Sequence, residues 1–251
     1  MSTADHFSSQ AQQYHDFRPT YPPALFDWLA QHTPADATVW DCGCGSGQAT
    51  LDLAARFGTV IGTDMSQKQL SQAQARPNIR YRCEPAEATS LADHSADLIV
   101  VAQALHWFRH DAFYAEVRRV AKPGALLVAL SYQLQQVAPA IDLLVHQLYA
   151  DILDGYWPPE RKHVEDGYRN LPFPFARMAA PAFQLEAEWK LHQLLGYFES
   201  WSAVAAFKAA RGGDPVAAMA AEFTQAWGDP ERRRKVRWPL TILAGRIDAA
   251  A

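Results

Sequence analysis

The chain has 251 residues, 49% of them hydrophobic, with a formal net charge of −4 and an isoelectric point near 6.1. This length and apolar content suffice for one sizeable core, and the acidic balance argues against a surface that binds nucleic-acid phosphates. Three cysteines without paired spacing argue against a disulfide framework and favour a reducing compartment. The first residues form no apolar stretch, and no apolar run approaches the roughly 18 residues of a membrane span. We therefore expect a cytoplasmic protein that contacts neither membrane nor nucleic acid.

Residues 1–35 read as one or two helices, the second of which begins at Pro22-Pro23 because proline suits the first turn of a helix. Beyond them, short apolar runs alternate with helical patterns as far as residue 132. The predicted strands cover 38–42, 59–63, 79–84, 96–102 and 125–131, and the predicted helices cover 48–57, 66–76 and 112–120. Strands that alternate with helices indicate βαβ units, and hence a parallel sheet with right-handed crossovers.

The chain beyond the fifth predicted strand has a different character. An amphipathic helix is predicted over 138–153, and the proline- and aromatic-rich stretch 154–181 indicates an irregular cap. The other predicted elements are a strand at 183–189, helices over 191–207 and 215–227, and a final strand at 236–243 with Pro239 at an edge or bulge.

A glycine loop follows the first predicted strand. It contains Gly43, Gly45 and Gly47, whereas the dinucleotide fingerprint would need a further glycine at Gln48. Glycines here allow positive φ and a close approach of a ligand, and the following helix presents unpaired N–H groups at its N-terminus. Asp64 ends the second strand, where a carboxylate would accept hydrogen bonds from two ribose hydroxyls. The loop predicts a nucleotide-type cofactor site; a tight turn that only packs is the alternative.

Several segments in this order resemble the motifs of class I S-adenosylmethionine-dependent methyltransferases, over about residues 35–135. The matching segments are Asp41–Gly47 (first motif), Asp64 (ribose-binding acid), Pro85-Ala86-Glu87 (adenine segment), Asp97–Val101 (fourth strand) and Lys122–Gly124 (turn before the fifth strand). One departure is Pro85, where many relatives carry an aspartate that contacts the adenine amine. Glu87 or a backbone carbonyl would have to make that contact here.

The resemblance implies a Rossmann-like, doubly wound α/β fold with a seven-stranded sheet whose last strand, 236–243, is antiparallel. It implies a helical cap from the N-terminus and an insertion after the fifth strand. We expect a single methyltransferase domain over 1–251. Its parts are an N-terminal cap (1–35), a cofactor-binding core (36–135), a cap insertion (136–181), and C-terminal strands and helices (182–251).

A narrower resemblance involves the edges of the chain. Phe7, Tyr14, Arg18–Pro22, Gln103–Phe108 and Gly196–Ser202 are similar to elements of trans-aconitate methyltransferase-like and biotin-pathway malonyl-carrier methyltransferase-like enzymes. In such enzymes the N-terminal helices fold over the cofactor.

These resemblances imply two sets of site residues. The set for S-adenosylmethionine comprises Tyr14, Arg18, Asp41, Gly43, Cys44, Gly45, Asp64, Met65, Ala86, Glu87, Gln103 and Ala104. The set for the acceptor comprises Tyr21, His106, Trp107, Trp157 and Trp201. Arg18 and Tyr14 would bind a carboxylate of either the cofactor or the substrate, because arginine pairs with carboxylates through two parallel bonds.

His106 follows the fourth strand, where the transferred methyl group is expected. Its ordinary pKa of about 6.5 suits a catalytic base at neutral pH. A substrate contact and a purely structural role are the alternatives. His106 and His110 have helical spacing but no third ligand, so we expect no metal site.

Methyl transfer from a sulfonium is an in-line displacement, and a carboxylate acceptor needs no base because it is already ionised. We expect S-adenosylmethionine-dependent methylation of a small molecule, on the oxygen of a carboxylate or hydroxyl, by a monomer or homodimer. The alternatives are C-methylation of a quinone-like ring and a non-catalytic S-adenosylmethionine-binding protein. A nicotinamide oxidoreductase is disfavoured by Gln48 and Asp41.

Overall fold

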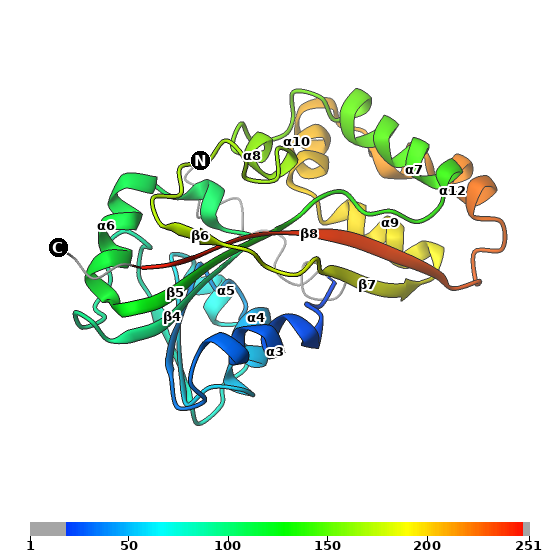
Figure 1. Ribbon diagram of the computed structural model, residues 1–251. Coiled ribbons are helices and arrows are strands. Elements are labelled where there is room, and N and C mark those ends of the chain that lie inside the picture. The colour runs from blue at the N-terminus through cyan, green and yellow to red at the C-terminus, as the bar shows by residue number, and fades with distance from the viewer. Residues whose placement is uncertain (1–18, 248–251) are drawn as a thin grey trace.

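The computed structural model describes residues 19–247 and shows a twisted sheet with helices on both faces (Figure 1). The sheet order is β3-β2-β1-β4-β5-β8-β6, in which β1 to β5 are parallel and β8 is antiparallel to β5. The strands are β1 (Thr38–Cys42), β2 (Thr59–Asp64), β3 (Ile79–Cys83), β4 (Ala96–Ala102), β5 (Ala121–Tyr132), β6 (Ala176–Met178), β7 (Gln184–Trp189) and β8 (Arg234–Arg246). The order reverses between β1 and β4, and open parallel sheets bind ligands at such a point, beyond the carboxyl ends of the strands.

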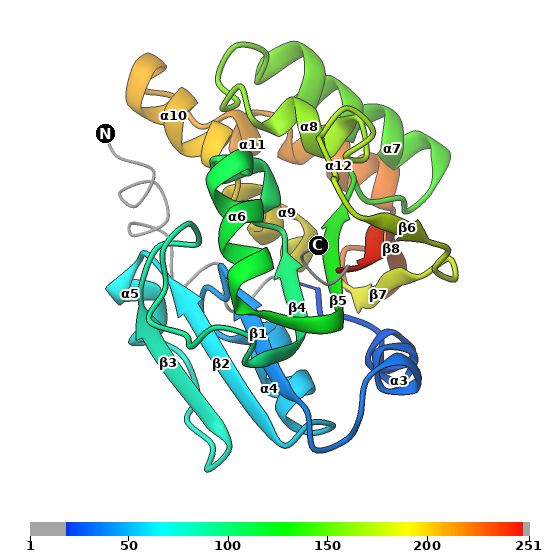
Figure 2. The same cartoon turned by 60° about the vertical axis from the view of Figure 1, so that its left-hand side comes forward.

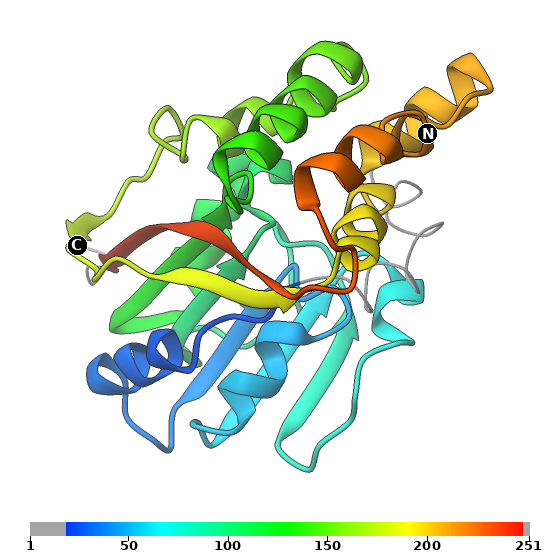
Figure 3. The same cartoon turned by 90° about the vertical axis from the view of Figure 1, so that its right-hand side faces the viewer.

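Two hydrophobic cores lie on opposite faces of the sheet. The helices against the parallel strands are α3 (Pro23–His32), α4 (Gln48–Ala54), α5 (Gln67–Leu70) and α6 (His110–Val120). Val39 and Val60 belong to the core shared with α3 and α4, whereas their neighbours Trp40 and Ile61 belong to the core shared with α6. Figures 2 and 3 show α6 on one face and α3 and α4 on the other. Because successive strand residues point to opposite faces, burial of both faces explains the uninterrupted apolar runs in the sequence.

The remaining helices gather beyond the ends of β4 and β5 (Figures 1 and 3). They are the 3-10 turn η1 (Leu105–Trp107), α7 (Pro139–His146), the π-helical η2 (Gln147–Ile152), α8 (Arg161–Glu165), α9 (Leu191–Glu199), α10 (Ser202–Arg211), α11 (Pro215–Ala218) and α12 (Ala220–Trp227). We call α7, η2 and α8, with their connections, the cap; it occupies the predicted insertion after the fifth strand. No helix of residues 19–247 is long and apolar enough to cross a membrane.

The sheet is seven positions wide, as predicted, although it contains eight strands. β6 pairs with residues 244–246 of β8 and β7 pairs with residues 234–239, so the two short strands share the position beyond β8. Pro181 lies between them and cannot donate a ladder hydrogen bond, which fits a break at that point. The antiparallel strand predicted at 236–243 is confirmed as the centre of β8.

Several predicted helices differ from the structure: the one over 48–57 ends at Ala54, the one over 138–153 becomes π-helical from Gln147, the one over 215–227 is divided at Met219, and those over 66–76 and 191–207 are also shorter. The helix expected over 66–76 ends at Leu70, because the residues that follow are almost all exposed and offer no apolar face to bury. The Ser66 hydroxyl accepts from the Gln69 N–H at 3.3 Å, but the Ser66 N–H donates to Asp64 instead of completing a capping box. The helix expected over 191–207 is interrupted at Ser200-Trp201, where the Ser200 hydroxyl donates to the Tyr197 carbonyl at 2.6 Å.

Candidate functional site

The glycine loop after β1 uses its three glycines for different purposes. Gly43, Gly45 and Gly47 have φ angles of 71°, 55° and 84°. A Cβ atom at Gly43 would lie 2.6 Å from the Ala104 Cβ, and one at Gly47 would lie 2.4 Å from the Tyr81 hydroxyl oxygen. A Cβ atom at Gly45 would meet nothing within 4 Å. Gly43 and Gly47 therefore make room for protein atoms, whereas Gly45 borders open space.

That open space is a cleft of about 1200 Å³, which includes volume open to solvent. Of the predicted cofactor residues, the cleft is lined by Gly43, Cys44, Gly45, Asp64, Met65, Ala86, Glu87, Gln103 and Ala104; of the predicted acceptor residues, it is lined by Tyr21 and Trp107. Tyr14 and Arg18 lie outside the described residues.

Asp64 holds the loop in place while keeping room for a ligand. Its Oδ2 accepts the Gly45 N–H and its Oδ1 accepts the Ser66 N–H, each at 2.8 Å. Burial raises the pKa of Asp64, and these two hydrogen bonds oppose the rise. Since each carboxylate oxygen can accept a second hydrogen bond, two ribose hydroxyls can still donate to Asp64.

Asp41 lies at the end of β1 and is fully buried. Its Oδ2 accepts from the Thr50 hydroxyl at 2.5 Å, while its Oδ1 has no hydrogen-bond partner among the described residues. Burial raises its pKa to about 7; the Thr50 bond opposes this and the charge of Asp64 adds to it. A buried acceptor without a partner costs free energy, so a cationic group held near the loop would be stabilised there.

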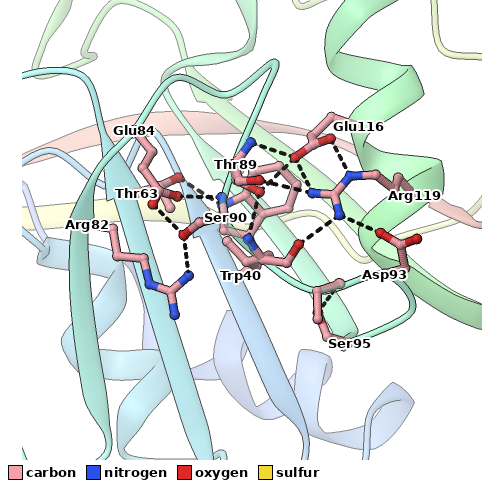
Figure 4. A network of polar contacts seen from close by, with 12 residues as sticks. Trp40, Thr63, Arg82, Glu84, Thr89, Ser90, Asp93, Ser95, Glu116 and Arg119 are labelled. Atoms are coloured by element: carbon pink, nitrogen blue, oxygen red, sulfur yellow. Dashed lines mark hydrogen bonds and ion pairs between the residues drawn. The ribbon is translucent and has the colours of Figure 1, made fainter.

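The loop after β3 forms the far side of the cleft and is fastened to α6 (Figure 4). Glu116 Oε1 accepts both the N–H and the hydroxyl of Thr89 at 2.7 Å. Arg119 donates to Glu116, to Asp93 and to the Leu91 carbonyl. The Arg119 bond is the largest influence that lowers the pKa of Glu116 to about 2, so this carboxylate stays ionised. Through this network the segment that bears Ala86 is fixed before any ligand binds.

Glu87 is committed to the protein through one of its oxygens. Its Oε1 accepts the Arg109 N–H at 2.9 Å, at the start of α6. The contact with adenine that the resemblance assigned to Glu87 therefore falls to Oε2 or to a backbone carbonyl, and stays a prediction.

Gln103 turns the chain sharply after β4. It is a non-glycine residue with φ of 57°, a conformation that costs on the order of 1 kcal/mol or more. Its N–H donates to the Leu130 carbonyl at 2.8 Å, and its side-chain amide donates to the Tyr132 carbonyl at 3.4 Å. The turn brings Ala104 against Gly43 and directs Trp107 into the cleft.

The structure places His106 away from the cleft, contrary to expectation. His106 is 8% exposed, and its Nδ1 lies 2.9 Å from the hydroxyl of Tyr168, in the segment after α8. Burial lowers its pKa to about 3, and the charges of Arg161, His163 and His110 add to the shift, so the ring is neutral and a weak base at neutral pH. Because side chains along a 3-10 turn are about 120° apart, Trp107 faces the cleft while His106 faces the cap. The geometry favours the structural role.

Trp157 and Trp201 also lie outside the cleft lining. Their ring centroids are 5.4 Å apart, and both pack against Tyr149. Sequence reasoning missed Tyr132, which lines the cleft; Phe108, at the end of the segment Gln103–Phe108, also lines it. Tyr132 could have been found, because it ends β5 at the ligand-binding edge of the sheet. Within residues 19–247, no three His, Cys, Asp or Glu side chains converge as a metal site requires.

Comparison with known proteins agrees with this geometry. Residues 40–129 match the model of a methyltransferase domain. A Dictyostelium discoideum protein named as a methyltransferase is 38% identical over 208 residues, covering 81% of this chain and 79% of its own. A solved structure from Anaeromyxobacter dehalogenans, named as a type II methyltransferase, shares 48% identity with a TM-score of 0.87, covering 93% of this chain and all of its own. A trans-aconitate 2-methyltransferase from Variovorax paradoxus is 36% identical over 98 residues, 38% of each chain.

Proposed function

Because the chain belongs to the class I S-adenosylmethionine-dependent methyltransferases, we propose that it methylates an oxygen atom of a small molecule, most favourably a carboxylate oxygen. We also propose that the chain belongs to the trans-aconitate-like subgroup. This part of the proposal is supported by a similarity that covers 38% of the chain.

The donor half of the cleft fits S-adenosylmethionine, which supplies a methyl group on a sulfonium that leaves readily. Asp64 would accept the ribose hydroxyls. Asp41 is buried behind the glycine loop and does not line the cleft, so we propose that it acts on the cofactor only through the loop that it supports. Met65 is 62% exposed beside the cleft, which leaves its side chain available to pack on the adenine ring. We also propose that Tyr14 and Arg18 bind the cofactor's carboxylate.

The composition of the cleft carries the proposal for the acceptor. Among the described residues that line it there is no histidine or lysine, and its acids are Asp64, Glu84 and Glu87, on the β2 and β3 side. The end near β4 and β5 presents Tyr21, Trp107 and Tyr132. These rings can orient an acceptor and exclude water, and such positioning supplies on the order of 7 to 11 kcal/mol to an in-line displacement. An ionised carboxylate suits this end because no proton has to be removed.

The same rings favour a second candidate, C-methylation of a flat quinone-like ring, which could stack on them. The two reactions differ in their need for a base. We expect release of S-adenosylhomocysteine with small carboxylates at a rate that is nearly constant from pH 6 to pH 9. Turnover of phenols or quinones alone, rising with pH, would favour the second candidate. No binding of S-adenosylmethionine below millimolar concentration would refute both.

We propose that residues 1–251 act as one methyltransferase domain, with the cofactor core at 36–135 and acceptor-selecting residues in the segments around it. The continuous sheet supports this, since β8 at the end of the described chain pairs directly with β5 of the core.

A further inference from the structure

The strands that carry the donor site lack a side chain at Gly62, and the ring of Tyr81 fills the space that this leaves. Gly62 of β2 pairs with Asp41 of β1 on one side and with Tyr81 of β3, the edge strand in Figure 2, on the other. Residues paired in this way point to the same face of the sheet, which is the face of Val60, two residues earlier, and of α4. A Cβ atom at Gly62 would lie 2.9 Å from Cδ1 and 3.0 Å from Cε1 of the Tyr81 ring. Because such an atom would overlap the ring, the glycine lets the ring lie across β2.

From this position Tyr81 reaches the glycine loop at two points. A Cβ atom at Gly47 would lie 2.4 Å from the Tyr81 hydroxyl oxygen and 3.2 Å from its ring carbon Cζ. A Cβ atom at Gly62 would also lie 3.0 Å from Sγ of Cys44, so the thiol and the ring meet over the same glycine. Cys44 lines the cleft, whereas Tyr81 does not. The ring therefore supports the loop on the side that faces away from the cleft.

Contacts at its far end hold the Tyr81 ring in place. The hydroxyl donates to the Gln74 carbonyl at 3.3 Å, in the segment that precedes β3. Burial is the largest of the causes that raise the pKa of Tyr81 to about 12, so the hydroxyl keeps its proton for this bond at neutral pH. Thr50 is among the groups that influence the same pKa, which places the hydroxyl near the first turn of α4. The ring therefore joins the edge strand to the loop and to the helix that follows the loop.

The loop is thus held from two directions. On the cleft side the Gly45 N–H donates to Asp64 Oδ2 at 2.8 Å, and on the other side the loop rests on Tyr81. The first N–H groups of an α-helix have no partner within the helix, and Gln48 and Ala49, the first residues of α4, line the cleft. Groups that bind a ligand together have to be held within about 0.5 Å of the productive geometry. Loss of the Tyr81 ring should therefore be felt in the cleft, although the ring does not line it.

We propose that Tyr81 is a positioning residue of the donor site, whose ring sets the position of the glycine loop and thereby the affinity for the amino-acid end of S-adenosylmethionine. The adenosine end is assigned to Asp64, Met65 and Ala86, so the amino-acid end falls to the loop and the start of α4. Asp64 keeps its bond to the Ser66 N–H when the loop moves, so adenosine binding is affected little. This inference rests on the proposed function and names a residue outside the cleft that tunes its donor affinity.

The test titrates the full-length protein calorimetrically with S-adenosylhomocysteine and with 5′-methylthioadenosine, which has the same adenosine but no amino-acid end. The variants are Tyr81→Leu, which removes the ring, Tyr81→Phe, which keeps it, and Gly62→Ala, whose added methyl group displaces it. Tyr156→Leu is the matched control, because Tyr156 is also partly buried, its hydroxyl bonds to Arg211 Nε at 2.8 Å, and it lies outside the cleft lining.

We expect Tyr81→Leu and Gly62→Ala to bind S-adenosylhomocysteine about 10-fold more weakly than the wild type, because the loop is displaced from Asp64. Their affinity for 5′-methylthioadenosine should stay within about threefold of the wild type. Tyr81→Phe and Tyr156→Leu should stay within about threefold for both ligands.

A double-variant cycle checks the contact itself. Gly47→Ala places a methyl group against the Tyr81 hydroxyl oxygen, which Tyr81→Phe removes. Gly47→Ala should therefore lower the urea midpoint less in the Tyr81→Phe background than in the wild type, and Tyr156→Phe should give no such relief.

The other outcomes overturn the inference in separable ways. Equal weakening of both ligands, unchanged affinities in Tyr81→Leu and Gly62→Ala, or additive losses in the cycle would each refute it and leave the proposed function intact. A loss in Tyr81→Phe as large as that in Tyr81→Leu would assign the effect to the hydroxyl and refute the role of the ring. A wild type that binds S-adenosylhomocysteine but not millimolar 5′-methylthioadenosine would contradict the assignment of the two ends. A wild type that binds neither would refute the proposed function itself. Urea unfolding checks that each variant is folded, and Gly62→Ala, which retains the ring, decides if Tyr81→Leu is not.

Discussion

The cofactor side of the cleft and the cap are held together by different kinds of contact. On the cofactor side, backbone N–H groups of Gly45 and Ser66 bind one carboxylate, Asp64, over short stretches of chain. In the cap, side chains bind side chains, and His106 meets Tyr168 across 62 residues. The first arrangement depends on glycine and aspartate at fixed spacing, whereas the second depends on how distant segments pack. The loop of the donor site is therefore held by backbone bonds to one side chain, whereas the cap is held by long-range packing.

The largest predicted effect is on the pH dependence of stability, which should differ between Asp41 on the cofactor side and His106 beside the cap. Asp41 has a pKa raised from 3.8 to about 7, so the folded protein holds its proton more tightly than the unfolded chain does. Its contribution to stability is present below pH 4 and is lost as the pH rises through 7. The free energy of unfolding of Asp41→Asn, relative to that of the wild type, should therefore rise by about 4 kcal/mol as the pH rises from 4 to 8. Urea unfolding of the ligand-free proteins at both pH values measures this, and a difference independent of pH would contradict the raised pKa.

His106 should give the opposite slope. Its pKa is lowered from 6.5 to about 3, so the unfolded chain takes up a proton that the folded protein excludes. This contribution is present above pH 6.5 and is lost as the pH falls toward 3. The free energy of unfolding of His106→Gln, relative to that of the wild type, should therefore rise by about 3 kcal/mol as the pH falls from 8 to 4. The same urea series checks it, and a slope of the same sign as that of Asp41→Asn would show that His106 is not buried as described.

Asp64→Ala tests the donor side through binding. It removes the acceptor of two backbone N–H groups and of the proposed ribose hydroxyls, each worth about 1.5 to 3 kcal/mol when the acceptor is charged. We expect S-adenosylmethionine affinity to fall about 100-fold or more by calorimetry. Asp27→Ala is the control, because Asp27 is an exposed acid whose ion pair with Arg56 contributes little. Wild-type affinity in Asp64→Ala would remove Asp64 from the ribose role.

Gly45→Ala and Gly47→Ala separate binding from packing within one loop. Both positions have positive φ, so both variants carry similar backbone strain. The added methyl group at position 47 meets Tyr81, whereas the one at position 45 enters the cleft. Gly47→Ala should be less stable than Gly45→Ala by about 1 to 2 kcal/mol in urea unfolding. Gly45→Ala should lose more affinity for S-adenosylmethionine than its loss of stability explains. Equal effects of the two variants on both measurements would contradict this division.

The same contrast explains what the sequence could predict. The parallel strands, the loop and Asp64 depend on alternation, glycine positions and strand ends, all of which are local signals. The shortened α5 depends on burial, which no local pattern reports, and the break at Ser200-Trp201 depends on the bond from the Ser200 hydroxyl to the Tyr197 carbonyl. The direction of His106 could not be predicted, because in the 3-10 turn η1 the side chains of His106 and Trp107 point about 120° apart and no local pattern says which of them faces the cleft. The sequence around Trp157 and Trp201 does not show that their rings pack against Tyr149 and not along the cleft.

The smallest predicted effect concerns the bond that joins the cap to η1. Tyr168→Phe removes the hydroxyl that pairs with His106 Nδ1 and leaves a buried ring nitrogen without that partner, which costs about 1 to 2 kcal/mol. Because neither residue lines the cleft, S-adenosylmethionine affinity should stay within twofold of the wild type by calorimetry. If His106 acted as a base aligned by Tyr168, Tyr168→Phe would instead lower kcat and shift its dependence on pH while stability changed little. A loss of stability with an unshifted pH profile therefore assigns the His106–Tyr168 pair to holding the cap in position, and makes the cap and the donor site energetically separate parts of the molecule.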